Sequence, residues 1–147
     1  MAYKLVLNPP QQGLSVIWNI STHVGCKQSK CFNHKTDVEL VKFLIAQHRK
    51  NTPFKKLTPS CAKPSLTVNG EFDAVLAFWI YAYQDVPGGV MDGVVSPAHG
   101  VSYGSAVWLI SWLNGSLMKE APQIYMQLDT YPELSAALRG ELKRTTP

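Results

Sequence analysis

Histidine and cysteine side chains gather in one short stretch of this sequence. Zinc prefers thiolate and imidazole ligands in a tetrahedral set, and Cys-x4-Cys is a spacing that it accepts. Strong zinc motifs pair two ligand doublets across a longer separation, which this stretch lacks. We therefore expect no metal and no other cofactor, with Cys26, Cys31 and His34 as weak metal candidates. The other residues of this type nearby are His23 and Cys61.

The same cysteines allow two further states. In an oxidising compartment we expect a disulfide that joins Cys26 to Cys31, or one that reaches Cys61. In a cytosol we expect free, partly buried thiols. The chain has 3 cysteines, so any single bridge leaves one thiol over, and the sequence leaves these alternatives open.

Acidic and nucleophilic residues form no recognisable catalytic arrangement. Asp85 and Asp92 flank a glycine turn, as the paired acids of some glycosidases do, but aspartate in such a turn more often bonds its own backbone. Gly88-Gly89 lacks the following Lys-Ser/Thr of a phosphate-binding loop. No sequence around the cysteines or serines favours an activated nucleophile. We expect no enzymatic activity, with a small hydrolase as a minor alternative.

The composition is that of one folded domain with a basic first half. Its 147 residues are 46% hydrophobic and 16% charged, which argues against disorder. Residues 1–73 hold 10 Lys/Arg and 4 Asp/Glu (+6), and residues 74–147 hold 4 and 6 (−2). The basic half could meet an anionic polymer, although a solvated face is the simpler interpretation. Basic and aromatic residues do not alternate as in single-strand binders, so nucleic acid is not favoured. The basic residues concerned are Lys27, Lys30, Lys35, Lys42, Arg49, Lys50, Lys55, Lys56 and Lys63.

Apolar runs in the sequence are too short for export or for membrane insertion. A secretory signal needs an apolar core of about 7–15 residues near the start, and a spanning helix needs about 20. The longest candidate runs from Ala74 to Tyr83 and ends in Gln84-Asp85. We expect no membrane insertion and a cytoplasmic protein as synthesised. Delivery to the periplasm or exterior by a non-standard route is the alternative.

Residues 66–84 organise the predicted fold. Asn69-Gly70 is a strong turn dipeptide, because both residues tolerate positive φ. Asp73 then fits the N-cap of a helix. From Val75 onward apolar residues fall on nearly every face of that helix. We therefore expect a central helix that is buried on most sides.

The other elements are predicted from periodicity and caps. Alternation predicts an N-terminal hairpin. Thr36 and Glu39 fit a capping box for the next helix, on which Lys42, Arg49 and Lys50 are expected to be exposed. The predicted elements are strands at 3–7 and 14–20, a helix from Thr36 to near Asn51, a helix over about 103–118 capped by Ser102, a short helix or loop at 124–128, and a helix from Pro132 to about Lys143 that aligns Leu134, Leu138 and Leu142. We expect a mainly α domain: a small bundle of three core helices plus a C-terminal helix, with an N-terminal β-hairpin.

Motifs in the same order mark the two ends of the central helix. A helix beginning Asp37-Val38 is followed by the turn Asn69-Gly70-Glu71-Phe72, a helix that ends in Tyr83-Gln84, and a second turn, Asp92-Gly93-Val94-Val95. This order resembles the three-helix peptidoglycan-binding domain family found in cell-wall amidases, over roughly residues 24–115. That family has an aspartate-valine helix, a (D/N)-G-x-F turn, a helix ending in Phe-Gln and a D-G-x-V turn. The chain departs from it at residues 73–76, where the family usually has Gly-Pro-x-Thr.

The resemblance implies a noncatalytic module that recognises bacterial cell wall, with peptidoglycan as its partner. The alternative is a protein-interaction or structural adaptor on the same fold, in a secretion system or a phage-tail-like assembly, with another protein as its partner. We expect residues 1–147 to form a single domain. Its parts are a hairpin extension at 1–23, the peptidoglycan-binding-like core at 24–115 and a C-terminal helical extension at 116–147.

Aromatic residues divide into expected core and expected contact positions. Trp79, Trp108 and Trp112 lie at helical spacing inside apolar segments and are expected in the core. Side chains near turns are better candidates for exposed contact with a ligand. The predicted ligand-binding residues are Tyr83, Gln84, Asp92 and His99.

Overall fold

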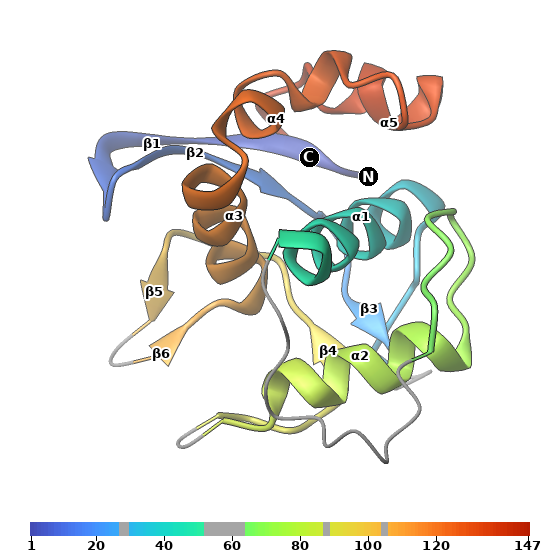
Figure 1. Ribbon diagram of the computed structural model, residues 1–147. Helices are drawn as coiled ribbons and strands as arrows, with labels where there is room; N and C mark the ends of the chain where they lie inside the picture. The colour runs from blue at the N-terminus through green and yellow to red at the C-terminus, as the bar shows by residue number, and fades with distance from the viewer. Residues whose placement is uncertain (27–29, 52–63, 87–88, 104–105) are drawn as a thin grey trace.

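The computed structural model describes residues 1–26, 30–51, 64–86, 89–103 and 106–147, and its elements are shown in Figure 1. Within these ranges no helix is long and apolar enough to cross a membrane. The fold mixes helices with short antiparallel sheets, so the prediction of a mainly α bundle is too helical. The elements are β1 (Tyr3–Gln11), β2 (Leu14–Asn19), β3 (Val24–Gly25), α1 (Lys35–Asn51), α2 (Ala74–Gln84), β4 (Val94–Val95), β5 (Ser102–Tyr103), β6 (Ala106–Val107), α3 (Leu109–Glu120), α4 (Pro122–Met126), the 3-10 helix η1 (Leu128–Thr130) and α5 (Ala136–Glu141).

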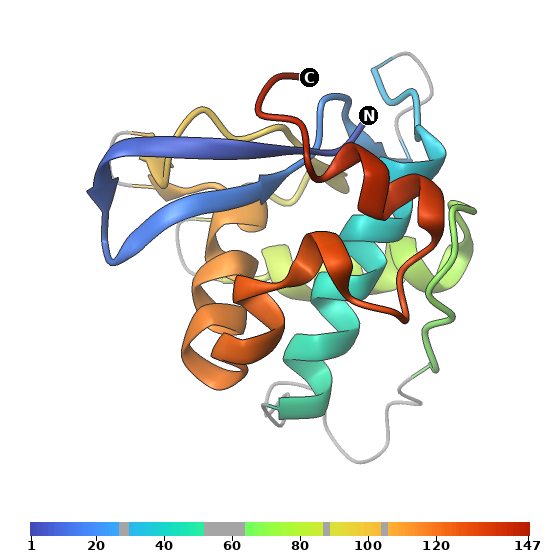
Figure 2. The ribbon, with the colours of Figure 1, turned by 90° about the horizontal axis from the view of Figure 1, so that it is seen from above.

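The N-terminal hairpin is confirmed. Strands β1 and β2 pair antiparallel, with Tyr3 opposite Asn19 and Val6 opposite Val16. The register shifts beyond Val6, and the far end of the hairpin extends past the helices (Figure 2). Two further antiparallel pairs, β3 with β4 and β5 with β6, join segments that sequence periodicity does not show to be extended.

The central helix is α1 and not α2. Figure 1 shows α1 between α2 on one side and α5 on the other. Most of its side chains are buried, whereas α2 leaves Phe78 36% and Tyr81 39% exposed. The prediction of a central helix at 74–84 is therefore wrong. Its continuous apolar pattern arises because α2 buries one face and presents large aromatic side chains on another.

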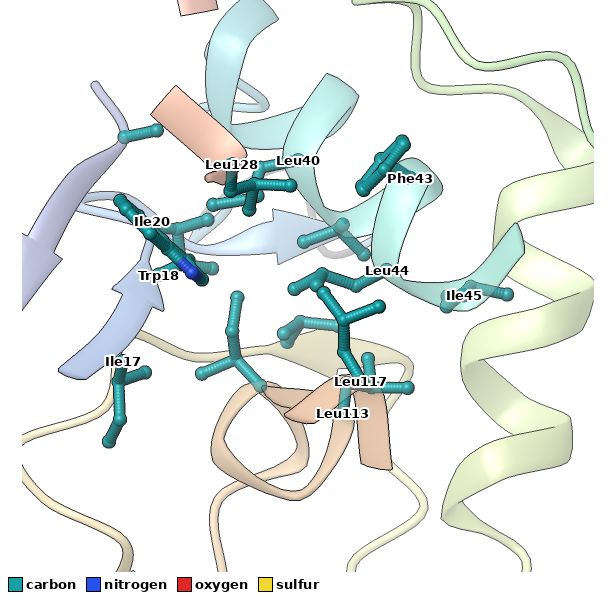
Figure 3. Packing of buried hydrophobic residues seen from close by; sticks show 14 of the residues in the cluster. Ile17, Trp18, Ile20, Leu40, Phe43, Leu44, Ile45, Leu113, Leu117 and Leu128 are labelled. Carbon is teal, nitrogen blue, oxygen red and sulfur yellow. The ribbon is translucent and has the colours of Figure 1, made fainter. Parts of the chain in front are cut away.

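One hydrophobic cluster joins the hairpin, the helices and the C-terminal segment. Figure 3 shows Trp18 of β2, and Ile20 just after it, near Leu40 of α1 and Leu128 of η1. The Lys4 amide also donates to the Arg144 carbonyl at 2.7 Å, which ties β1 to the chain after α5. Residues 1–23 and 116–147 thus help to enclose the core. The C-terminal leucines expected on one side of a helix are all buried, although α5 contains only the second of them: Leu134, Leu138 and Leu142.

The predicted capping box at the start of α1 is wrong. The helix begins at Lys35, so Thr36 lies within its first turn, where its hydroxyl is 3.0 Å from Nδ1 of His34. The Glu39 carboxylate accepts instead from the amide (2.8 Å) and the hydroxyl (2.7 Å) of Ser135. Glu39 therefore bonds a distant segment of the chain and does not cap its own helix.

The third and last helices both begin later than predicted. Helix α3 starts at Leu109 because residues 102–103 pair with 106–107 as a β-ladder and cannot form its first turn. Ser102 is therefore not its cap. Helix α5 starts at Ala136 and not near Pro132, because the Ser135 hydroxyl accepts from the Leu138 amide at 3.1 Å. The segment predicted as short helix or loop at 124–128 divides between α4 and η1.

Candidate functional site

Aromatic rings from α1, α2 and α3, and from the segments before β5 and α3, contact one another in two groups. The His99 ring lies 5.7 Å from that of Trp108, measured between centroids. Trp112 follows one helical turn later, since its amide donates to the Trp108 carbonyl at 2.9 Å. The Trp112 ring lies 4.9 Å from His48 of α1 and 6.0 Å from Tyr83 of α2. We call these residues, His99, Trp108, Trp112, Tyr83 and His48, the aromatic strip.

The aromatic strip is exposed to solvent at Trp112, whereas the two rings beneath Trp112 are buried. Trp112 is 45% exposed, while Tyr83 is 6% and His48 8% exposed. The indole of Trp112 therefore rests on a buried pair of rings that restricts its motion. A large aromatic side chain that is both exposed and held in place can bind a ligand with little loss of conformational entropy. Such a ring offers its flat apolar face to a partner.

The buried pair beneath Trp112 is uncharged at neutral pH. Nδ1 of His48 lies 2.6 Å from the Tyr83 hydroxyl. Burial raises the pKa of Tyr83, opposed by the charge of Arg49. Burial lowers the pKa of His48, opposed by the charge of Glu120. The protonated phenol of Tyr83 can then donate to the neutral imidazole of His48. The two buried rings beneath Trp112 therefore carry no charge.

A cation lies beside the strip, against the ring of Trp79. The Arg49 guanidinium is 3.8 Å from the centroid of this ring, a cation–π geometry. Arg49 Nη1 (3.3 Å) and Trp79 Nε1 (3.0 Å) also both donate to the Pro64 carbonyl. Trp79 is fully buried, which confirms its predicted place in the core. Trp108 is partly buried, and the core prediction for Trp112 is wrong.

The first Asx–Gly turn is held by a buried lysine. Lys42 has an exposure of 0%, so its predicted exposure on α1 is wrong. Its Nζ donates to Oδ1 of Asn69 at 2.7 Å and to Oδ2 of Asp73 at 2.8 Å. The other Asp73 oxygen accepts from the Leu76 amide at 2.8 Å, which confirms Asp73 as the N-cap of α2. One ammonium thus joins α1, the turn and the start of α2.

The second Asx–Gly turn is held by Gln84 at the end of α2. Its Nε2 donates to Oδ1 of Asp92 at 3.1 Å and to the Val94 carbonyl at 2.9 Å. Its Oε1 accepts from the Gly93 amide at 2.9 Å. Gln84 is buried and uses both ends of its amide within the chain. The expectation that Gln84 is an exposed contact is wrong, and its position at the helix end serves the turn.

Close packing at this turn requires glycine. Gly93 has φ +71°, and a Cβ there would lie 2.6 Å from the Tyr81 hydroxyl oxygen and 2.8 Å from Sγ of Cys26. Cys26 is exposed and carries a free thiol 3.5 Å from that hydroxyl. A bridge from Cys26 to Cys31, one of the states that the sequence leaves open, is therefore absent, and Cys61 lies outside the described residues. Cys26 packs as a neighbour of the turn.

The weak metal candidates are separated by other contacts. Cys26 faces Tyr81, and His34 faces the Thr36 hydroxyl at 3.0 Å. His23, also in this stretch, lies 3.1 Å from the Ser96 hydroxyl. Within the part of the chain that the structure describes, no three His, Cys, Asp or Glu side chains come together as metal ligands. Several residues of the predicted basic cluster (Lys27, Lys55, Lys56 and Lys63) lie outside that part.

The predicted ligand residues fall into two places. Tyr83 and His99 belong to the aromatic strip, Tyr83 at its buried base and His99 at its exposed end. Gln84 and Asp92 bond each other at the second turn. The sequence pattern did not identify Trp112 as an exposed residue or His48 as its support. The spacing of the residues could have shown that Trp112 is exposed. Trp108 and Trp112 are four residues apart and lie on a different face of α3 from its buried residues. The buried residues are Ile110, Leu113 and Leu117.

Comparison of this chain with models of protein families, with curated proteins and with solved structures found no match. The likeness to peptidoglycan-binding domains therefore stays a prediction that depends on the two turn motifs and the helices between them.

Proposed function

We propose that this chain is a noncatalytic binding module for bacterial peptidoglycan, and that the aromatic strip is its contact surface. The observation that carries the proposal is Trp112, which is 45% exposed on a base of buried rings. The apolar C–H face of a sugar ring can lie flat against an indole. A glycan strand repeats such faces at intervals, and Trp108, one helical turn before Trp112, has a second ring contact, with His99, that suits an elongated ligand.

Charge beside the strip favours the same class of ligand. The last turn of helix α1 carries the cations Arg49 and Lys50, of which Lys50 is exposed. Peptidoglycan carries carboxylates on its peptides, and cations at the edge of a contact surface attract an anionic polymer over several ångströms. The neutral strip would supply the flat contact, and the basic end of α1 would supply attraction that weakens with salt.

A sedimentation assay on insoluble peptidoglycan sacculi tests this proposal at low and at high salt. We expect the protein to be retained at both salts and Trp112→Ala to bind about tenfold more weakly, the usual loss for a tryptophan at the centre of an interface. Phe78→Ala is the matched control, because Phe78 is an exposed aromatic on α2 outside the strip. It should bind as the unchanged protein does. No retention, or retention at low salt alone, would overturn the proposal.

The second candidate is a protein-interaction or adaptor role, in a secretion system or a phage-tail-like assembly. It is favoured by the exposed apolar side chains of α2 and the segment after it: Phe78, Tyr81, Val86, Val90 and Met91. Exposed apolar side chains in one region are typical of protein contact surfaces. If Phe78→Ala abolished an interaction that Trp112→Ala left intact, the α2 surface and not the strip would be the functional one.

A further inference from the structure

The outward face of α2 carries an apolar stripe. Helix α2 contains no charged residue, although it lies at the edge of the fold, on the far side of α1 from α5 (Figure 1). Its exposed residues are Ala74, Phe78 and Tyr81, and the exposed Asp85 follows as its C-cap. These four positions are spaced four, three and four residues apart, so they share one side of the helix, as the contact residues of a helix pair do. We call these four residues the α2 seam.

The two large side chains of the α2 seam are held in place. The Phe78 ring lies edge-on to the buried ring of Trp79, with 5.2 Å between the centroids and 89° between the planes. The hydroxyl oxygen of Tyr81 lies 3.5 Å from Sγ of Cys26. Phe78 is 36% and Tyr81 39% exposed. Exposed rings that are already held lose little conformational entropy when a partner covers them.

The α2 seam is symmetrical about its own midpoint. Phe78 and Tyr81 lie equally far from the midpoint, and so do Ala74 and Asp85. An interface around a two-fold axis uses the same patch on both copies, so the patch must complement itself. When two α2 helices pack antiparallel about an axis through this midpoint, Phe78 of one copy lies level with Tyr81 of the other.

Small residues beside the α2 seam leave room for these rings. Ala77 and Ala82 flank the seam on its two sides and are only partly exposed. In the antiparallel pair the Tyr81 ring of one copy lies over Ala77 of the other copy. The Phe78 ring of one copy likewise lies over Ala82 of the other copy. The large side chains of each helix thus fit beside the small ones of its partner.

We propose that two copies of this chain associate through the α2 seam as an antiparallel helix pair. The chain has a net charge of +4, but α2 brings no like charges face to face. Asp85 of each copy lies beside Ala74 of the other copy, at the positive end of the helix dipole. The proposal does not depend on peptidoglycan recognition, because association is measured without a ligand.

Sedimentation equilibrium of the full chain under reducing conditions tests the proposal. The reductant keeps Cys26, the neighbour of Tyr81, from linking two copies by a disulfide. We expect a reversible monomer–dimer equilibrium with a dissociation constant on the order of 10 µM, since a single helix face is a small interface. The assay on sacculi is run well below this constant, where the chain is monomeric, so Phe78→Ala remains its control.

Variants at Ala74 test the antiparallel arrangement. Ala74→Lys places an ammonium beside Asp85 of the other copy and should tighten the dimer about fivefold through two exposed ion pairs. Ala74→Glu places a carboxylate there and should weaken the dimer by a similar factor. The helix dipole favours Glu over Lys at the start of a helix, so an effect on helix stability alone would have the opposite order.

A variant of the α2 seam and a matched control complete the test. Phe78→Ala should weaken the dimer about tenfold or more, because the interface contains this ring twice. Met126→Ala removes an apolar side chain that is 72% exposed on α4, outside the seam, and should leave the dissociation constant unchanged. A chain that stays monomeric about tenfold above the expected constant would overturn the proposal and leave the seam to a different protein. Association that Phe78→Ala leaves unchanged, or equal effects of the two Ala74 variants, would overturn it as well.

Discussion

The two Asx–Gly turns at the ends of α2 look alike in sequence and are held by different chemistry. Asn69-Gly70 is fixed by the charged ammonium of Lys42, which comes from α1. Asp92-Gly93 is fixed by the neutral amide of Gln84, which comes from α2 itself. A short turn motif therefore predicts a bend in the chain without saying what stabilises it. The first turn therefore depends on an ion pair, whereas the second depends on an uncharged donor and acceptor from Gln84.

Breaking the charged turn should have the largest effect on stability. Asp73→Ala leaves the buried ammonium of Lys42 with Asn69 alone and removes the cap of α2. We expect a loss of about 3 kcal/mol in the free energy of unfolding, at the low end for a broken buried pair because Asp73 is 41% exposed. Urea denaturation measures it. Glu71→Ala, an exposed change in the same turn, should cost little, and a loss below about 1 kcal/mol for Asp73→Ala would contradict the importance of the pair.

Breaking the neutral turn should cost somewhat less. Gln84→Leu keeps the volume of the side chain but leaves the Gly93 amide and the Val94 carbonyl without their partner. We expect a loss of about 2 kcal/mol, the usual cost of unsatisfied buried polar groups. The same denaturation experiment measures it, with Gln123→Leu at an exposed position of α4 as the control. Equal stability of Gln84→Leu and the unchanged protein would mean that Gln84 does not hold the turn.

The smallest predicted effect is a difference between the two turns in how the stability that they contribute depends on pH. Burial raises the pKa of the Asp73 carboxyl, but hydrogen bonds from Lys42 and from the Leu76 and Val75 amides, with the lysine charge, bring it below its usual 3.8. The unfolded chain then takes up this proton first as the pH falls. The stability from Asp73 is complete above about pH 4 and is lost as the pH falls through the lowered pKa.

Stability curves against pH for Asp73→Asn and Gln84→Leu test this difference. Asp73→Asn should flatten part of the decline at acid pH, whereas Gln84→Leu should lower the whole curve without changing its slope. Glu71→Gln serves as the control for removal of an exposed carboxylate. If Asp73→Asn kept the full acid slope, the charged character assigned to the first turn would be wrong.

Local signals in the sequence predicted one helix cap, that of α2, and missed the starts of the other helices. Asp73 caps α2 as expected because a cap needs only the residues within one turn of it. The partner of Asp73 could not be found in this way, since Lys42 lies 31 residues earlier and looks like a surface lysine on a helix. Glu39 fails as a capping-box residue for the same reason: its partner, Ser135, is 96 residues away. Contacts between distant segments override local preference at both residues.

The strip was only partly predictable. Tyr83 and His99 were expected to be exposed contact residues; His99 is exposed, but Tyr83 is 6% exposed and lies under Trp112, so the expectation is wrong for Tyr83. Trp112 was assigned to the core because its segment is apolar, although its spacing from Ile110 and Leu113 places it on another face of α3. His48 supports Trp112 because α1 packs against α3. The sequence of neither helix alone predicts how the two helices pack.

The most direct measurement is an NMR titration with solubilised peptidoglycan fragments, read from the indole N–H signals of the tryptophans. Trp112 is 45% exposed and Trp79 is fully buried, so the Trp79 signal serves as an internal control for the Trp112 signal. We predict that the Trp112 signal shifts in a saturable way while the Trp79 signal stays in place. An unmoved Trp112 signal at saturating fragment concentrations would contradict recognition of peptidoglycan through the aromatic strip.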